Sequence, residues 1–248
     1  MCHVASAAYR IGRRPERDGT QEKQMKAYLK MLAVFLGLII ACGCETDSLF
    51  RAHRFFQRRQ YDKAEWWFTY YLDKSEDRED NMEYRAAGYC WRGLARSALS
   101  KHEASISDYR EALSRVPDCF YASFNLGVEL LMSKRYGEAV DSFRCAWAGV
   151  QKAHKGELDD SKLWDRNTLD RDSEFCFQYL GMLLLKTRNI DGIKALLDDS
   201  KKLPLKMNRQ STKEAYRKME KAVGGGLDGF DVDCDFQKWE SARIGLRR

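Results

Sequence analysis

The chain has 248 residues, with 43 Lys and Arg against 37 Asp and Glu, and therefore a formal net charge of +6. Residues 1–41 hold seven of the basic and three of the acidic residues, which leaves 36 and 34, a net charge of +2, for the rest. So small an excess gives no argument for nucleic-acid binding, which normally requires a strong basic face, and we expect no nucleic-acid partner. Only three prolines in the chain favour helices throughout the remaining residues, which are enough for one sizeable domain.

The first apolar run is MLAVFLGLIIACGC, residues 31–44, which contains no charge. A helix of this length covers about 21 Å, less than the roughly 30 Å hydrocarbon core of a bilayer. The run suits the apolar region of a secretory signal peptide, and Lys23, Lys26 and Lys30 form the basic region before it. A signal of ordinary length results if synthesis begins at Met25. We therefore interpret residues 1–24 as an upstream extension and residues 25–41 as the signal peptide.

The end of this run, Ile39-Ile40-Ala41-Cys42, resembles the lipobox of bacterial lipoproteins. The resemblance implies that the Cys42 thiol receives a diacylglycerol, that the bond before it is cut, and that the new amino terminus is acylated. Several acyl chains together anchor a protein firmly to a membrane. Gly43 stands where an Asp would favour inner-membrane retention, so we expect an outer-membrane location facing the periplasm. An uncleaved signal anchor is the alternative.

A regular repeat follows in the middle of the chain, with a period of thirty-four residues. Three pairs of residues are each separated by this period: Gly93 and Gly127, Tyr109 and Phe143, and Ala112 and Ala146. The pattern resembles the tetratricopeptide repeat, in which small residues lie where two helices cross and large aromatic residues fill the space between neighbouring pairs. The resemblance covers about residues 45–205, in four units: 45–78, 86–119, 120–153 and 174–205.

This resemblance implies an all-α fold, a right-handed solenoid of about four helix-turn-helix repeats whose stacking supplies the core. Polar residues 154–173 are predicted to form an insertion, either a long loop or a helix extension. Tyr216, Met219 and Val223 share one helical face and predict a capping helix over residues 209–223. We expect residues 224–248 to form a flexible acidic and glycine-containing tail.

In this family the concave groove usually takes an extended peptide or a partner helix. By alignment, the predicted partner-binding groove is lined by His53, Phe56, Leu94, Phe124, Val128, Leu131, Met182 and Leu185, with Leu49, Cys90, Ser97 and Gln178 beside them. This mainly apolar lining suits a hydrophobic peptide or helix. It lacks the Lys and Asn set that clamps a C-terminal carboxylate in some family members. The alternatives are that these residues belong to the core or that the C-terminal segment fills the groove.

Enzyme chemistry has few candidates in this sequence. His53, His102 and His154 are scattered, and no Cys-x-x-Cys, His-Glu-x-x-His or phosphate-loop pattern occurs. His102 stands where the repeat usually has an aromatic residue, which favours a packing role. An EF-hand loop starting at Asp231 fails, because Phe236 stands where glycine is needed. We therefore expect no catalytic residues, no cofactor, no metal site and no small-molecule substrate.

Six cysteines besides Cys2 and Cys42 conflict with export to an oxidising compartment, and a bridge between Cys145 and Cys176 is one interpretation. The prediction from all these features is a membrane-anchored protein-interaction scaffold or adaptor in the bacterial envelope. Its partners are a protein or peptide in the groove and the membrane through the lipid anchor. The alternatives are a cytosolic binding module or chaperone for a secreted partner, and an enzyme with an unrecognised site.

Overall fold

A computed structural model describes residues 48–75, 81–157, 169–203, 205, 207–225 and 236–237. These residues belong to one compact unit, Asp47–Arg248. The predicted upstream extension, the signal peptide and the predicted lipidation site at Cys42 lie outside the described residues.

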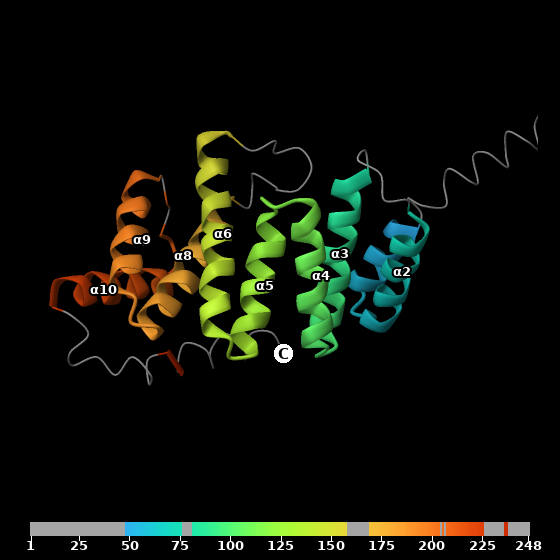
Figure 1. Ribbon diagram of the computed structural model, residues 1–248, viewed down its shortest axis with the longest axis horizontal. Helices are drawn as coiled ribbons and strands as arrows, with labels where there is room; N and C mark the ends of the chain where they lie inside the picture. Colours follow the sequence, from blue (N-terminus) through green and yellow to red (C-terminus); the bar gives the residue numbers. More distant parts are fainter. Residues whose placement is uncertain are drawn as a thin grey trace, which may run out of the picture. The chain divides into compact units, whose positions relative to one another are not determined.

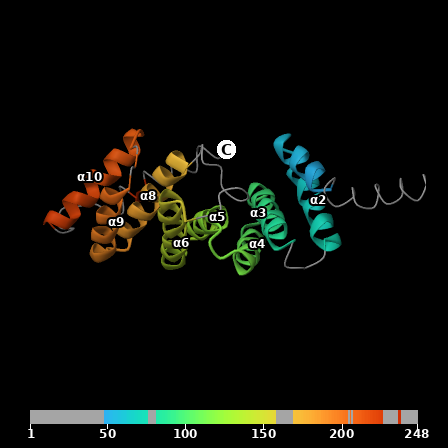
Figure 2. The same cartoon turned by 90° about the horizontal axis from the view of Figure 1, so that it is seen from above.

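Every regular element in the described part of the chain is a helix. Their bounds are 48–57 for the first helix, then α2 Tyr61–Lys74, α3 Met82–Ala98, α4 His102–Arg115, α5 Phe120–Met132, α6 Tyr136–Lys155, α8 Leu169–Lys186, α9 Ile190–Lys202 and α10 Gln210–Gly225. From α2 onward, each of these helices packs against the next, and α10 packs on both α8 and α9 (Figures 1 and 2). The all-α class expected from the sequence is confirmed for this part of the chain.

Four turns of one form join these helices in pairs. Arg59, Ser100, Lys134 and Arg188 each follow a helix in the left-handed conformation, with φ between 55° and 59°. At all four turns the next residue donates its N–H to the carbonyl five residues before it, as Lys101 does to Arg96 at 2.9 Å and Arg135 does to Leu130 at 2.8 Å. This six-to-one bond is the Schellman helix ending. The pairs are 48–57 with α2, α3 with α4, α5 with α6, and α8 with α9.

The repeat spacing in the sequence corresponds to one crossing contact within each of two pairs. A Cβ atom added at Gly93 would lie 2.8 Å from the Tyr109 ring, and one added at Gly127 would lie 2.8 Å from the Phe143 ring. Any larger residue would therefore hold the two helices apart. At Gly181 the close neighbour is the sulfur of Met219 on α10, at 2.6 Å, so the last pair uses α10 at this position.

Several predicted boundaries differ from the observed ones. Helix α3 begins at Met82, four residues before the predicted unit. Both ends of the predicted insertion 154–173 are helical, because α6 continues to Lys155 and α8 begins at Leu169. Helix α6 then ends at Gly156, whose φ of 71° glycine adopts without strain. Residues 158–168, the middle of the predicted insertion, lie outside the described part, so its form stays a prediction.

The C-terminal region also departs from the predicted flexible tail. Helix α10 includes Gly224 and Gly225, and its Met219 is fully buried while Tyr216 and Val223 are partly buried. Phe236 is 1% exposed, and its ring lies 5.6 Å from the Tyr136 ring. Burial removes this apolar ring from water, which offsets the entropy cost of ordering the residue.

The core is unevenly distributed along the chain. One large cluster extends from Ile106 to Phe236, whereas the first pair is joined to α3 by a small cluster of Ala52, Ala64, Phe68 and Ala95. The first pair therefore has the smallest of the buried apolar clusters.

Among the helices that the structure describes, none is long and apolar enough to cross a membrane.

Candidate functional site

The first half of the predicted groove is accessible. The first helix supplies His53 and Phe56, and α3 supplies Leu94, all partly exposed. The structure adds Trp91 to them, because its ring lies 4.7 Å from the His53 ring and 5.3 Å from the Phe56 ring, both edge to face. We call His53, Phe56, Trp91 and Leu94 the inner aromatic surface. It offers apolar area beside one polar imidazole.

The second half of the predicted groove is closed. Val128, Leu131, Met182 and Leu185 are between 3 and 4% exposed. Phe124 packs edge to face against Phe143 and Tyr179, at 5.3 and 5.4 Å between ring centroids. Phe124 is only partly buried, whereas the other four lie in the core because α8 and α10 continue the stack and cover them. A partner could reach them only if helices moved apart, so their role in binding stays a prediction.

Three polar side chains meet beneath the accessible surface. The Glu129 carboxylate on α5 is almost fully buried, accepts a hydrogen bond from the Ser97 hydroxyl and lies 2.8 Å from His102 Nδ1. A catalytic triad needs the imidazole beside the hydroxyl so that it can take the proton. Here the carboxylate lies between them, so the cluster joins α3, α4 and α5 and activates no nucleophile. His102 is therefore a polar partner of Glu129 and not the packing residue predicted.

A second buried carboxylate links the first two pairs. Asp108 on α4 lies 2.8 Å from the Arg92 guanidinium and 2.9 Å from that of Arg96. Burial raises the pKa of the Asp108 carboxyl, although both arginines act in the opposite direction. Arg92 also donates to the Thr69 hydroxyl on α2 at 3.4 Å. This network stabilises the junction between α2, α3 and α4.

The four described cysteines are free thiols, so the structure has no bridge between Cys145 and Cys176, the interpretation that the sequence left open. Cys145 is exposed, whereas Cys176 is buried and donates to the Phe143 carbonyl at 3.6 Å. The neighbouring Cys119 thiol and burial raise the pKa of Cys90 well above its usual value. Among the described residues, no group of His, Cys, Asp and Glu is arranged to hold a metal ion.

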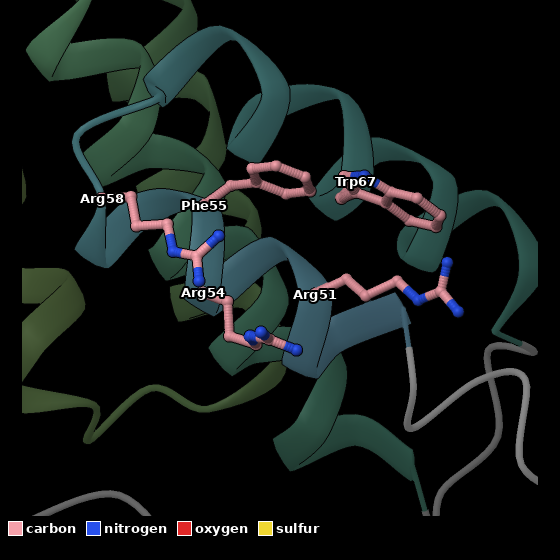
Figure 3. Close-up of a pocket in the computed structure, with 5 residues that line it drawn as sticks. All are labelled: Arg51, Arg54, Phe55, Arg58 and Trp67. Atoms are coloured by element: carbon pink, nitrogen blue, oxygen red, sulfur yellow. The ribbon is translucent and has the colours of Figure 1, made fainter.

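An open pocket of about 270 Å³ lies on the first helix pair, lined by Arg51, Arg54, Phe55, Arg58 and Trp67. The three arginines project from residues 48–58, and the two aromatic rings lie beside them (Figure 3). The Arg51 guanidinium carbon is 5.1 Å from the centre of the Trp67 ring, a cation–π distance. Arg54 and Arg58 make no side-chain ion pair with any described residue.

Exposed apolar side chains gather around the same pair. Within the described residues, the large apolar side chains that are well exposed lie between positions 50 and 84: Phe50, Trp66, Tyr70, Met82 and Tyr84. Phe50 is 72% and Trp66 58% exposed. The Trp66 ring stacks on Tyr70 at 5.7 Å and meets Trp67 edge to face at 4.8 Å. The rings of α2 therefore form a continuous group that reaches the pocket.

Sequence reasoning missed this pocket, although its signal is present. The segment SLFRAHRFFQRRQY, residues 48–61, holds four arginines and no acidic residue. Arg51, Arg54 and Arg58 are spaced by three and four residues, and therefore lie on one face of a helix. The groove predicted by alignment lies on other positions of this helix and does not include that face.

Comparison with known proteins assigns no family. No protein-family model matches the chain, and no curated protein matches it. Two solved structures with similarity are "MamA RS-1 ArsTM double mutant" and "MamA 41-end from Desulfovibrio magneticus RS-1". They have TM-scores of 0.40 and 0.39, each at 15% identity over 75% of this chain and 97% of theirs. Likeness at this level does not establish a shared family or function.

Proposed function

We propose that this protein is a tetratricopeptide-type scaffold of four repeats, capped by α10, that binds a protein partner and is tethered to a bacterial membrane. The observation that carries the proposal is the equivalence of the helix pairs. The Gly93–Tyr109 and Gly127–Phe143 contacts are separated by one repeat period, and the left-handed residues Ser100 and Lys134 have the same spacing. A stack of equivalent helix pairs is typical of binding proteins.

The inner aromatic surface is the proposed partner site. It combines Phe56, Trp91 and Leu94 with His53, and it is partly exposed. Aromatic residues contribute a large share of binding energy at protein interfaces, because they bury much area at a small entropy cost. The proposed ligand is a hydrophobic peptide or one apolar face of a helix.

The proposed tether is a lipid on Cys42, for which the lipobox-like sequence Ile39-Ile40-Ala41-Cys42 is the support. The proposed location is the bacterial envelope, at the outer membrane facing the periplasm. The test is the intact mass of the membrane-extracted protein beside a Cys42→Ala variant. We expect a species that begins at residue 42 with acyl mass added, absent from the variant. A species that keeps residues 25–41 without acyl mass would exclude the tether.

Partner binding has its own test. Leu94→Arg places a charge within the inner aromatic surface, and Ser107→Arg places the same charge on an exposed position of α4. Cross-linking in envelope extracts should give a partner adduct with the parent chain and with Ser107→Arg. The adduct should be at least tenfold weaker with Leu94→Arg, the effect of losing about 1.4 kcal/mol of binding free energy. Equal adducts from both variants would place the partner elsewhere, and thermal unfolding of both variants controls for folding.

One observation favours a second candidate, a cytosolic binding module. Cys90, Cys119, Cys145 and Cys176 are all free, as is usual in a reducing compartment. The mass measurement separates the two candidates, because only an exported protein is cut at residue 42. A chain with an intact amino-terminal region and four free thiols would favour the cytosolic module.

A further inference from the structure

Each later helix pair has one face that is covered by the pair before it. The equivalent face of the first pair is its outer face. Arg59 and Ser100 are equivalent turn residues, so Arg54, five positions before Arg59, corresponds to Ala95 on α3. Ala95 is fully buried against the first pair, and Glu129, the equivalent residue before Lys134, is 1% exposed. Arg54 instead lines an open pocket. Among the described residues, no preceding helix pair covers this face of the first pair.

This face is basic, and two of its arginines form no ion pair with a described residue. At about 100° of rotation per residue, Phe50, Arg51, Arg54 and Arg58 share roughly a 100° arc of the first helix. The guanidinium groups of Arg54 and Arg58 pair with no described carboxylate. Inner repeats show the contrast, since Arg92 is paired with Asp108 at 2.8 Å. The exposed arginines favour an anionic partner by simple charge complementarity.

Aromatic rings of α2 adjoin the arginines at Arg51. Arg51 contacts Trp67, which meets Trp66, which stacks on Tyr70. Tryptophan, tyrosine and arginine are the residues enriched where a protein surface meets a lipid headgroup layer, because each combines an apolar body with a polar tip. We call Phe50, Arg51, Arg54, Arg58, Trp66 and Tyr70 the basic aromatic face.

The chain itself brings this face close to the proposed anchor. Ser48, the first described residue of the first helix, is six positions after Cys42. Even fully extended, six positions of chain reach only about 20 Å. If Cys42 carries a lipid, Ser48 is therefore held within that distance of the headgroups, which gives the first helix a high effective concentration at the membrane surface.

We infer that the basic aromatic face docks on the surface of a bilayer that contains anionic phospholipids, so that the first repeat lies against the membrane. The arginines bind lipid phosphates, and Phe50, Trp66 and Tyr70 enter the headgroup layer. The inference rests on the proposed tether, which supplies the proximity. It adds a second attachment that depends on lipid charge, and it fixes which end of the repeat stack meets the membrane.

The test uses the full chain reconstituted in vesicles of neutral phosphatidylcholine, with or without anionic phosphatidylglycerol, both with brominated acyl chains that quench tryptophan. A Trp66→Phe variant isolates the Trp66 signal. We expect stronger quenching of Trp66 in the anionic vesicles, and its loss at high salt, which screens charges. Arg51→Gln/Arg54→Gln/Arg58→Gln should lower the docked-to-free ratio about a hundredfold, at roughly fivefold for each arginine near an anionic surface.

A matched variant controls for net charge. Lys194→Gln/Lys213→Gln/Arg217→Gln removes the same charge from exposed positions on α9 and α10, and it should quench like the parent chain. Flotation with neutral vesicles reports the tether separately. Flotation with equal Trp66 quenching in both lipids would overturn the docking and leave the tether standing. Flotation with anionic vesicles only, lost in the arginine variant, would support the docking and exclude the tether.

Other occupants of the face give different results. Equal quenching in both lipids, together with arginine-dependent binding of a glutamate-rich peptide, would assign the face to an acidic protein and overturn the docking. Equal quenching together with a dimer that the arginine variant abolishes would assign it to a second copy of the chain. Far-UV circular dichroism of the arginine variant should match the parent, because the replaced side chains are exposed.

Discussion

At the scale of single residues, four turn residues of the described chain adopt a conformation that side chains rarely favour. Arg59, Ser100, Lys134 and Arg188 all have φ between 55° and 59° although none is glycine. A residue with a Cβ atom has a small energy penalty there, and glycine has none. The Schellman bonds at Ser100 and Lys134 hold these turns in place despite the penalty. The strain therefore comes from the residue type and not from the hydrogen-bond geometry.

Ser100→Gly should stabilise the protein by about 0.5–1 kcal/mol, because glycine removes the left-handed penalty at this turn. Ser107→Gly on exposed α4 is the control and should destabilise by about 0.5 kcal/mol, since helix interiors disfavour glycine. Urea unfolding of both variants gives the two changes. Effects of the same sign would contradict a left-handed turn at Ser100.

His154 gives the stability of the folded protein a weak dependence on pH. Its Nε2 lies 3.2 Å from the Ser173 hydroxyl, between the end of α6 and the start of α8. Burial lowers the pKa of His154, while Asp170 acts in the opposite direction. Folding therefore favours the neutral imidazole. Its contribution is present above the unfolded pKa of about 6.5 and is lost as the pH falls through the lower folded pKa.

We expect the parent chain to lose somewhat more stability than a His154→Gln variant when the pH falls from above to below that range. The difference should be well under about 1 kcal/mol, because the imidazole is partly exposed and solvent screens it. Urea midpoints of the two chains across the range measure it. Parallel pH profiles would show that His154 does not titrate differently in the folded state.

At the scale of elements, the distance between paired helices depends on one glycine per crossing. A Cβ atom at Gly127 would lie 2.8 Å from the Phe143 ring, whereas nothing lies within 4 Å of one at Gly137 on α6. The same substitution therefore has opposite consequences at these two positions. At Gly127 the crossing contact, and not helix propensity, decides whether a substitution by Ala stabilises or destabilises the protein.

Gly127→Ala should destabilise the protein by about 1–3 kcal/mol, because the Phe143 ring must shift within a packed core. Gly137→Ala should stabilise it by about 0.5–1 kcal/mol, since it adds helix propensity without a contact. Thermal unfolding compares the two. Partial recovery of Gly127→Ala by Phe143→Leu would identify the ring as the cause, and a neutral Gly127→Ala would contradict the close approach.

At the scale of the whole molecule, stability is expected to be uneven along the stack. The buried apolar cluster between the first pair and α3 consists of three alanines and Phe68, with Tyr71 and Leu72 packed near Gly88, while α5, α6 and α8 share the large cluster. Local opening requires less free energy where less apolar area is buried. The basic aromatic face therefore belongs to the least protected repeat, the one that a membrane contact would stabilise most.

Hydrogen exchange of the full chain should show the amides of residues 48–57 and α2 exchanging well before those of α5, α6 and α8. The reason is the smaller cluster, and mass spectrometry of peptic fragments resolves the segments. Anionic vesicles should slow exchange in the first pair alone. Uniform exchange along the described helices would mean that the stack opens as a single unit.

The sequence by itself determined the helical pairs and their spacing. Gly93, Gly127, Tyr109 and Phe143 specify a crossing contact because only a small residue admits a large ring, and a contact between near neighbours in sequence needs no knowledge of distant segments. Met219 was found for a similar reason, since helical periodicity marks a buried face. The positions of the small and the aromatic residues at the crossings can thus be predicted from the local sequence.

Only the tertiary structure decided which surfaces remain open. Leu94 and Met182 were assigned to one groove by alignment, yet Leu94 is partly exposed while Met182 is buried by the helices that follow it. Arg54 and Ala95 are equivalent in the repeat, and only Ala95 has a preceding pair against it. Exposure depends on what packs against a residue from elsewhere in the chain, and a local pattern does not contain that information.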